Sequence, residues 1–136
     1  MRTDKRLISV LLAACLSPVW ADTVVIVNPK QTTKLTPADI RNIYLGNKKS
    51  FPDGTTAIPV TLKDGKSRDQ FMAEVLGKTE GQYKALWSRL MFTGTGQPPR
   101  EVESEDEIKK VVAVNPNIIG FIDSSKLDAS VRDATK

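Results

Sequence analysis

The sequence predicts an α/β domain, with a mixed sheet of few strands flanked by about four helices. Segments rich in β-branched residues alternate along the chain with segments in which apolar residues recur every three or four positions. This alternation is typical of strands and helices packed in layers. Residues 22–136 make up 115 of the 136 residues, which is the usual length of one domain with its own core.

Three segments are predicted to be strands. Residues 23–28 (TVVIVN) form an unbroken run rich in β-branched residues, which is typical of a buried strand. Residues 57–62 (AIPVTL) and 118–122 (IIGFI) have the same character. Pro59 has no N–H to donate, so it indicates an edge position or the first residues of its strand. We expect the polar tail from Ser125 onward to fray.

Four helices are predicted from residues that can cap their N-termini. Each follows a serine or threonine whose hydroxyl can accept a hydrogen bond from the first turn. Three of these residues are followed at the third position by glutamine or glutamate, which completes a capping box. The predicted N-caps are Thr36, Ser67, Thr79 and Ser104, with box partners Gln70, Gln82 and Glu107 for the last three. The third helix has an apolar stripe that we assign to the core: Tyr83, Leu86, Trp87, Leu90 and Met91.

The first 21 residues have the composition of a secretory leader. Basic residues precede a ten-residue apolar run at 7–16, and small residues at Val19 and Ala21 fit a signal-peptidase site. The apolar run is shorter than the roughly 20 residues that span a bilayer. We therefore expect cleavage after Ala21 and a periplasmic protein. Two alternatives stay open: lipoprotein processing at Cys15, within the sequence LAAC, and a buried N-terminal helix.

Composition narrows the function classes. The chain has 20 basic and 16 acidic residues, of which the leader holds three basic residues and one acidic residue. Residues 22–136 therefore carry a net charge of +2, which gives no reason to expect nucleic-acid binding. The chain has no histidine, and its one cysteine lies in the leader. These absences remove the usual general base, the Ser-His triad, the common zinc sites and any disulfide within residues 22–136. We expect a binding protein rather than an enzyme, without a metal or cofactor.

The segment from Lys63 to Arg68 is the strongest candidate for a binding site. A strand leads there into a short loop and a helix, whose N-terminus offers unpaired N–H groups and partial positive charge to an anion. The predicted anion-binding residues are Lys63, Gly65, Lys66, Ser67 and Arg68. A P-loop is excluded because Val60 stands where its first glycine is required. The alternative is that Ser67 only caps the helix and the cations are solvated.

A glycine-rich loop at 93–99 (TGTGQPP) is a second candidate. Glycines let an anion approach backbone N–H groups closely. The residues concerned are Thr93, Gly94, Thr95 and Gly96. The alternative is that this segment simply ends the preceding helix and links it to the next element.

Taken together, these segments resemble the phosphate-type substrate-binding proteins of ABC transporters, and in particular small single-domain members of that type 2 periplasmic-binding-protein-like group. The resemblance covers nearly all of residues 22–136. The matching stretches are VVIVNP (24–29), LTPADIRNIYLG (35–46), KSFPDG (49–54), IPVTLKDGKSRDQF (58–71), LWSRLMFTGTGQPPREV (86–102) and VVAVNPNIIGFID (111–123).

The resemblance implies an exported protein that binds phosphate or a similar oxyanion, with the fold of a single periplasmic-binding-protein-like lobe. Larger relatives bind phosphate with a serine-glycine-threonine turn at a helix start; Gly65, Lys66 and Ser67 stand at those positions here, so the tripeptide itself is absent. A second lobe would come from a dimer mate or from another protein, such as the transporter's membrane components. The alternative is an envelope protein-interaction module that has lost its ligand.

Overall fold

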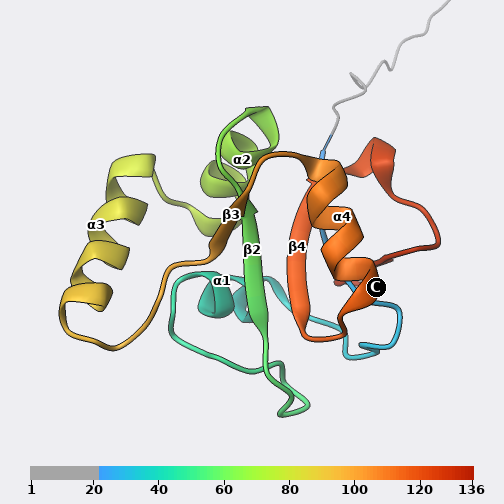
Figure 1. The fold of residues 1–136 in the computed structure, drawn as a ribbon, viewed down its shortest axis with the longest axis horizontal. Helices are drawn as coiled ribbons and strands as arrows, with labels where there is room; N and C mark the ends of the chain where they lie inside the picture. Colours follow the sequence, from blue (N-terminus) through green and yellow to red (C-terminus); the bar gives the residue numbers. More distant parts are fainter. Residues whose placement is uncertain (1–21) are drawn as a thin grey trace, which may run out of the picture.

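A five-stranded mixed sheet runs through the molecule in the order β3-β2-β4-β1-β5 (Figure 1). The computed structural model describes residues 22–136, so the predicted leader and Cys15 lie outside the described residues. The strands are β1 (Thr23–Val27), β2 (Ile58–Leu62), β3 (Arg100–Val102), β4 (Ile118–Asp123) and β5 (Arg132–Asp133). β2 is parallel to β3 and β4, whereas β1 is antiparallel to β4 and β5. The predicted α/β class and mixed sheet are confirmed.

The three predicted strands appear as β1, β2 and β4, and two short strands were not predicted. β2 lies between β3 and β4, so an edge position for this strand is wrong. Pro59 is nevertheless free of a second partner strand, because the pairing with β3 begins only at Val60. The missing N–H of Pro59 therefore costs no hydrogen bond to β3. This agrees with the other prediction for Pro59, that it stands among the first residues of its strand.

The expectation that the tail frays is wrong. Residues 124–126 form the short helix η2 (Ser124–Lys126), and β5 then pairs with β1. Val131 and Ala134 are buried on either side of β5. The Arg132 guanidinium donates hydrogen bonds to the carbonyl oxygens of Gln31 and Thr33. These contacts hold the tail against the start of the chain.

The helices are α1 (Pro37–Tyr44), α2 (Lys66–Gln70) with its continuation η1 (Phe71–Leu76), α3 (Glu80–Phe92) and α4 (Glu105–Val114). Thr79 caps α3 in a complete box with Gln82, as predicted. Thr36 caps α1, and Asp39 completes a box that was not predicted. Ser104 accepts a bond from the Glu107 N–H, but the Glu107 carboxylate accepts from Glu103 rather than from Ser104, so that box is only half formed.

The predicted N-cap at Ser67 is wrong. Gly65 is the N-cap of α2, with φ +106°, a conformation that glycine adopts without the penalty of a Cβ atom. Helical geometry therefore begins at Lys66, and Ser67 is a buried residue of the first turn. The α-helix lasts five residues and passes into the π-helical turn η1, which Gly77 ends in a left-handed conformation.

Helices cover both faces of the sheet, with α4 in front of β4 and α1 behind β2 (Figure 1). On the α1 side, the Phe71 ring stacks on Phe121 at 4.0 Å between centroids and meets Tyr44 edge-on at 4.6 Å. The buried Tyr44 hydroxyl donates to the carbonyl oxygens of Val60 and Ile119, at 2.8 and 3.1 Å. This contact ties α1 to the two central strands.

α3 stands at the side of the molecule, beyond the open edge of β3 (Figure 1). Tyr83 and Trp87 are buried, which confirms that these aromatics belong to the core. The predicted stripe is too wide, however, because Met91 is 46% exposed and Leu86 and Leu90 are only partly buried. Within residues 22–136, no helix has the length and apolar character needed to cross a membrane.

Candidate functional site at the carboxyl edge of the sheet

Three parallel strands end at one edge of the sheet. β3, β2 and β4 run in the same direction, so their carboxyl ends at Val102, Leu62 and Asp123 lie together. α2 follows the end of β2, and α4 follows the end of β3. Ligands of open α/β sheets bind outside the carboxyl ends of the strands. The predicted segment from Lys63 to Arg68 thus stands where the fold offers a site.

A hollow of about 480 Å³ opens over this edge. It brings together Gly65, Lys66 and Ser67, three of the five predicted anion-binding residues. The other lining residues are Leu62, Asp64, Glu103, Ser104, Glu105, Asp123 and Lys126. Lys63 does not line the hollow; its ammonium lies 3.9 Å from the Glu103 carboxylate, and both side chains are largely exposed. Arg68 lies outside the hollow as well.

The start of α2 is open toward a ligand. No side chain among residues 22–136 caps this helix, so its first N–H groups have no side-chain acceptor. A Cβ atom placed on Gly65 would meet nothing within 4 Å, which leaves free space beside the backbone. Lys66 is exposed next to it. The backbone and one cation can therefore face an anion at this point.

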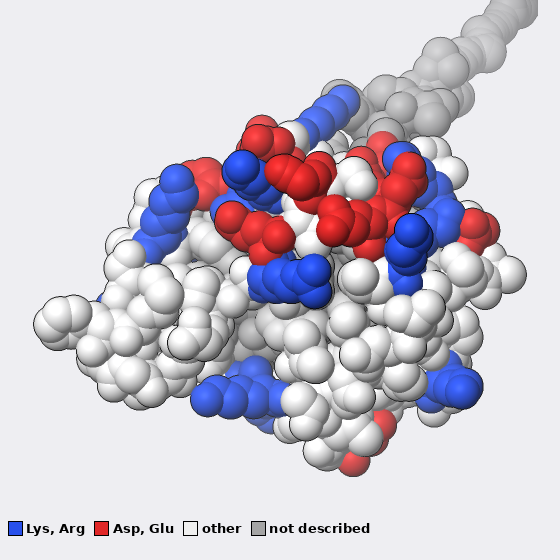
Figure 2. Space-filling view, viewed as in Figure 1, with Lys and Arg blue, Asp and Glu red and all other residues white. Residues whose placement is uncertain are grey.

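Carboxylates surround the same hollow. Asp64, Glu103, Glu105 and Asp123 line it, against only two lysines. Figure 2 shows acidic side chains gathered over this edge of the molecule, interleaved with basic ones. The Glu105 carboxylate is partly occupied because it accepts a hydrogen bond from the Asp123 N–H. The edge is therefore more acidic than the sequence segment 63–68 suggested by itself.

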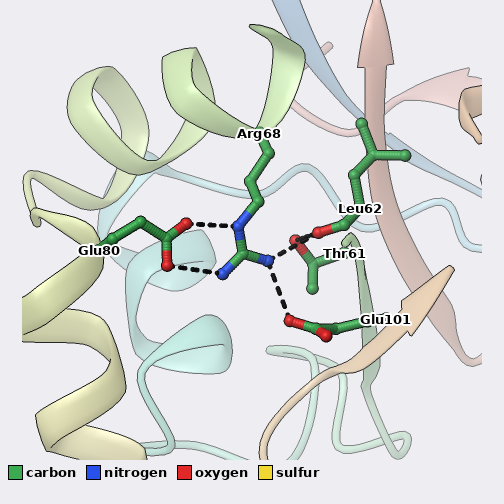
Figure 3. A network of polar contacts seen from close by, with 5 residues as sticks. All are labelled: Thr61, Leu62, Arg68, Glu80 and Glu101. Atoms are coloured by element: carbon green, nitrogen blue, oxygen red, sulfur yellow. Dashed lines mark hydrogen bonds and ion pairs between the residues drawn. The ribbon is translucent and has the colours of Figure 1, made fainter. Parts of the chain in front are cut away.

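The buried side chain of Arg68 contacts residues of several helices and strands (Figure 3). Its side chain is 3% exposed, and its guanidinium donates to both carboxylate oxygens of Glu80, at 2.6 and 3.1 Å. The same group donates to the Leu62 carbonyl at 2.6 Å and to Glu101 at 3.3 Å, and it lies 5.5 Å from the centre of the Tyr83 ring. One side chain thus joins α2, α3, β2 and β3.

These contacts shift the protonation equilibria in the expected directions. The hydrogen bonds from Arg68 lower the pKa of Glu80, and those to Glu80 raise the pKa of Arg68. Burial raises the pKa of Tyr83. Four of the five guanidinium N–H groups have acceptors within the protein and the side chain is buried, so in this arrangement Arg68 is turned away from an anion at the start of α2. Sequence reasoning missed both carboxylates, which are 12 and 33 positions away.

The glycine-rich loop at 93–96 forms the C-terminal cap of α3. The N–H groups of Thr93, Gly94 and Thr95 donate to the carbonyls of Arg89, Met91 and Leu90 respectively. The two threonine hydroxyls also donate to α3 carbonyls. These three backbone donors are thus used inside the helix end, the arrangement that the sequence left as the alternative, and only Gly96 and Thr95 line a neighbouring hollow.

Several solved structures align with this chain. A phosphate ABC transporter substrate-binding protein with bound phosphate from Clostridium perfringens aligns with a TM-score of 0.65 and 24% identity, over 83% of this chain and 44% of that one. An ABC-type phosphate transport receptor from Vibrio cholerae aligns with a TM-score of 0.62 and 20% identity, over 82% and 44%. PstS from Borrelia burgdorferi aligns with a TM-score of 0.55 and 15% identity, over 74% and 40%.

The likeness is one of fold. No protein-family model matches the chain, and no curated protein matches it in sequence. The chain spans less than half the length of the solved structures it resembles. It therefore has the α/β fold of one part of phosphate ABC transporter substrate-binding proteins.

Proposed function

We propose that this chain is an exported oxyanion-binding protein of the phosphate-receptor type. The observation that carries the proposal is the uncapped start of α2 at the carboxyl edge of the sheet, where Gly65 leaves the backbone open and Lys66 supplies a cation. Proteins of the same fold are named as phosphate-binding, which supports phosphate or a similar anion as ligand. In the proposed site, Gly65, Lys66 and Ser67 face the anion, and Lys63 strengthens the local positive potential.

Arg68 has a different part in this proposal. It holds the α2 start against α3 and β3 and does not touch the anion, because Glu80, Glu101 and Leu62 occupy its donors. A bound anion would gain only a weak field from exposed lysines, about 0–1 kcal/mol each, and the lining carboxylates oppose it. A tight complex thus requires a second cationic wall, from a dimer mate or from another protein of the transporter.

Calorimetric titration with phosphate and then sulfate, at low salt, tests the proposal. The protein is expressed with its own residues 1–21 and purified after export; mass spectrometry of the product shows whether cleavage follows Ala21 or whether Cys15 carries a lipid. Lys66→Gln is expected to weaken phosphate binding by about twofold to fivefold, since it removes the cation beside the N–H groups. Lys110→Gln, an exposed lysine on α4, is the matched control.

Saturable heat that Lys66→Gln weakens and Lys110→Gln leaves unchanged supports the site. Binding that is unaffected by Lys66→Gln would place the anion elsewhere. No heat and no rise in melting temperature at about 10 mM phosphate would reject an oxyanion-binding function for the lone chain, because a ligand at many times its Kd must stabilise the folded state.

A second candidate function is an envelope interaction module that has kept the fold and lost the ligand. The lining carboxylates and the engaged Arg68 favour it, since both oppose anion binding at this edge. Its partner would present a basic surface to the acidic edge. Glu103→Gln combined with Asp64→Asn would then release the partner from the immobilised protein, whereas phosphate would have no effect on the complex.

A further inference from the structure

A groove runs beside α3. Two hollows of about 500 and 430 Å³ lie on either side of the segment 97–100 and share the walls Trp87, Pro98 and Pro99. The larger hollow reaches Met91 on α3, and the smaller one reaches Ile58 at the start of β2. We call the two hollows together the α3 groove.

Uncovered apolar side chains border the α3 groove. Met91 and Ile58 line it and are 46% and 42% exposed. Phe92, next to Met91 at the end of α3, is 93% exposed. On α3 only Tyr83 and Trp87 are buried and Leu90 packs partly against the core, whereas Met91 and Phe92 at the end of the helix are exposed. Apolar surface gathered at a hollow marks a place of association.

The charges of the groove are almost all positive. Lys48, Lys49 and Arg100 line the smaller hollow, which has no carboxylate in its wall. None of these three cations forms an ion pair with another of the described residues. Figure 2 shows the carboxylates gathered over the opposite, upper edge, while the surface over α3 and below it is mostly uncharged with basic residues at its borders. Cations beside apolar walls favour an occupant that combines carboxylates with apolar groups.

We propose that the α3 groove binds an extended segment of a partner protein in which carboxylates alternate with aromatic or aliphatic side chains. In an extended segment every second side chain points to the same face, so two apolar side chains two positions apart can enter the two hollows. The exposed cations Lys48, Lys49 and Arg100 attract the carboxylates of the same segment. This surface is distinct from the start of α2 and does not depend on oxyanion binding.

Trp87 provides the signal for the test. In a Trp20→Phe chain it is the only tryptophan, and its ring lies in the wall shared by both hollows. The probe is a short blocked peptide in which phenylalanine alternates with aspartate, titrated while Trp87 fluorescence is recorded. The comparison peptide has asparagine in place of aspartate. We expect saturable binding of the acidic peptide and at least tenfold weaker binding of the neutral one.

Variants locate the binding. Lys49→Gln combined with Arg100→Gln is expected to weaken the acidic peptide at least tenfold; both residues are exposed, so unfolding is not a concern, and a melting curve verifies this. Lys34→Gln combined with Lys110→Gln, two exposed lysines outside the groove, leaves binding unchanged. Lys66→Gln, which tests the oxyanion site, also leaves peptide binding unchanged, so the two proposals fail separately.

Three results would overturn the proposal. Equal affinity for the acidic and neutral peptides would remove the role of the cations. Unchanged affinity in the Lys49→Gln, Arg100→Gln chain would place the peptide elsewhere. A protein that self-associates in sedimentation, loses this association in the same double variant and shows no fluorescence response to either peptide would have a second copy of the chain in the groove.

Discussion

Arg68→Met separates a structural role for Arg68 from a role in binding the anion. Methionine keeps the apolar stem of the side chain and removes the guanidinium. The buried carbonyl of Leu62 then keeps only the long hydrogen bond from the Thr61 hydroxyl, at 3.4 Å, and the loss of the Arg68 donor costs about 1–3 kcal/mol. The bonds to Glu80 and Glu101 are lost too, but these carboxylates are 42% and 49% exposed and regain water, so each loss is about 1 kcal/mol or less.

With the contact to the Tyr83 ring, at about 0.5–1 kcal/mol, the expected loss in the free energy of unfolding is about 3 kcal/mol. Urea unfolding measures it: with a slope of about 1.5 kcal/mol/M, the midpoint falls by about 2 M. Lys66→Met, an exposed cation in the same turn, is the control and changes stability by less than about 0.5 kcal/mol. A loss below about 1 kcal/mol for Arg68→Met, combined with loss of phosphate binding, would refute the structural role.

Other predictions concern caps, packing and pH. Ser67→Ala costs less than about 0.5 kcal/mol in urea unfolding, whereas Ser104→Ala costs about 1 kcal/mol, because only the second residue caps a helix; equal costs would contradict the observed caps. Gly120→Ala lowers the melting temperature, since the added Cβ comes within 2.5 Å of an α4 side chain, and the overpacking costs about 1–3 kcal/mol; an unchanged temperature would show that α4 can shift. The hydrogen bond from Lys109 lowers the pKa of Asp128 to about 2, so the stabilising effect of the ionised carboxylate is full above about pH 4 and is lost as the pH falls towards 2. In a plot of unfolding free energy against pH, Asp128→Asn therefore reduces the fall between about pH 4 and pH 2 and does not change the slope near pH 7.

Local signals were sufficient for most of the fold. β1, β2 and β4 are short runs rich in apolar and β-branched residues, which are typical of buried strands, and the caps at Thr36 and Thr79 depend on residues three positions apart. The two strands that were missed are three and two residues long, so their composition carries little pattern. Their place follows from pairing with partners far along the chain, which the sequence alone does not display.

The start of α2 was predicted to within one residue, but the charges around it were not. The strand, loop and helix order located the start of α2, yet Ser67 was mistaken for the cap because the left-handed conformation of Gly65 moves the helix start by one residue. The sequence placed Arg68 among the anion ligands because it does not show that the partners of Arg68 lie on α3 and β3. A helical arginine next to a serine has the same local pattern whether it faces solvent or is buried against carboxylates of other elements.

The central claim is that an oxyanion binds at the start of α2, and amide chemical shifts test it most directly. In a titration of the isotopically labelled protein with phosphate, the ¹H–¹⁵N signals of Gly65, Lys66 and Ser67 are expected to move most and to saturate together. Largest shifts around Lys48 and Lys49, or shifts that grow without saturation across the whole spectrum, would contradict the claim and leave the carboxyl edge without its proposed ligand.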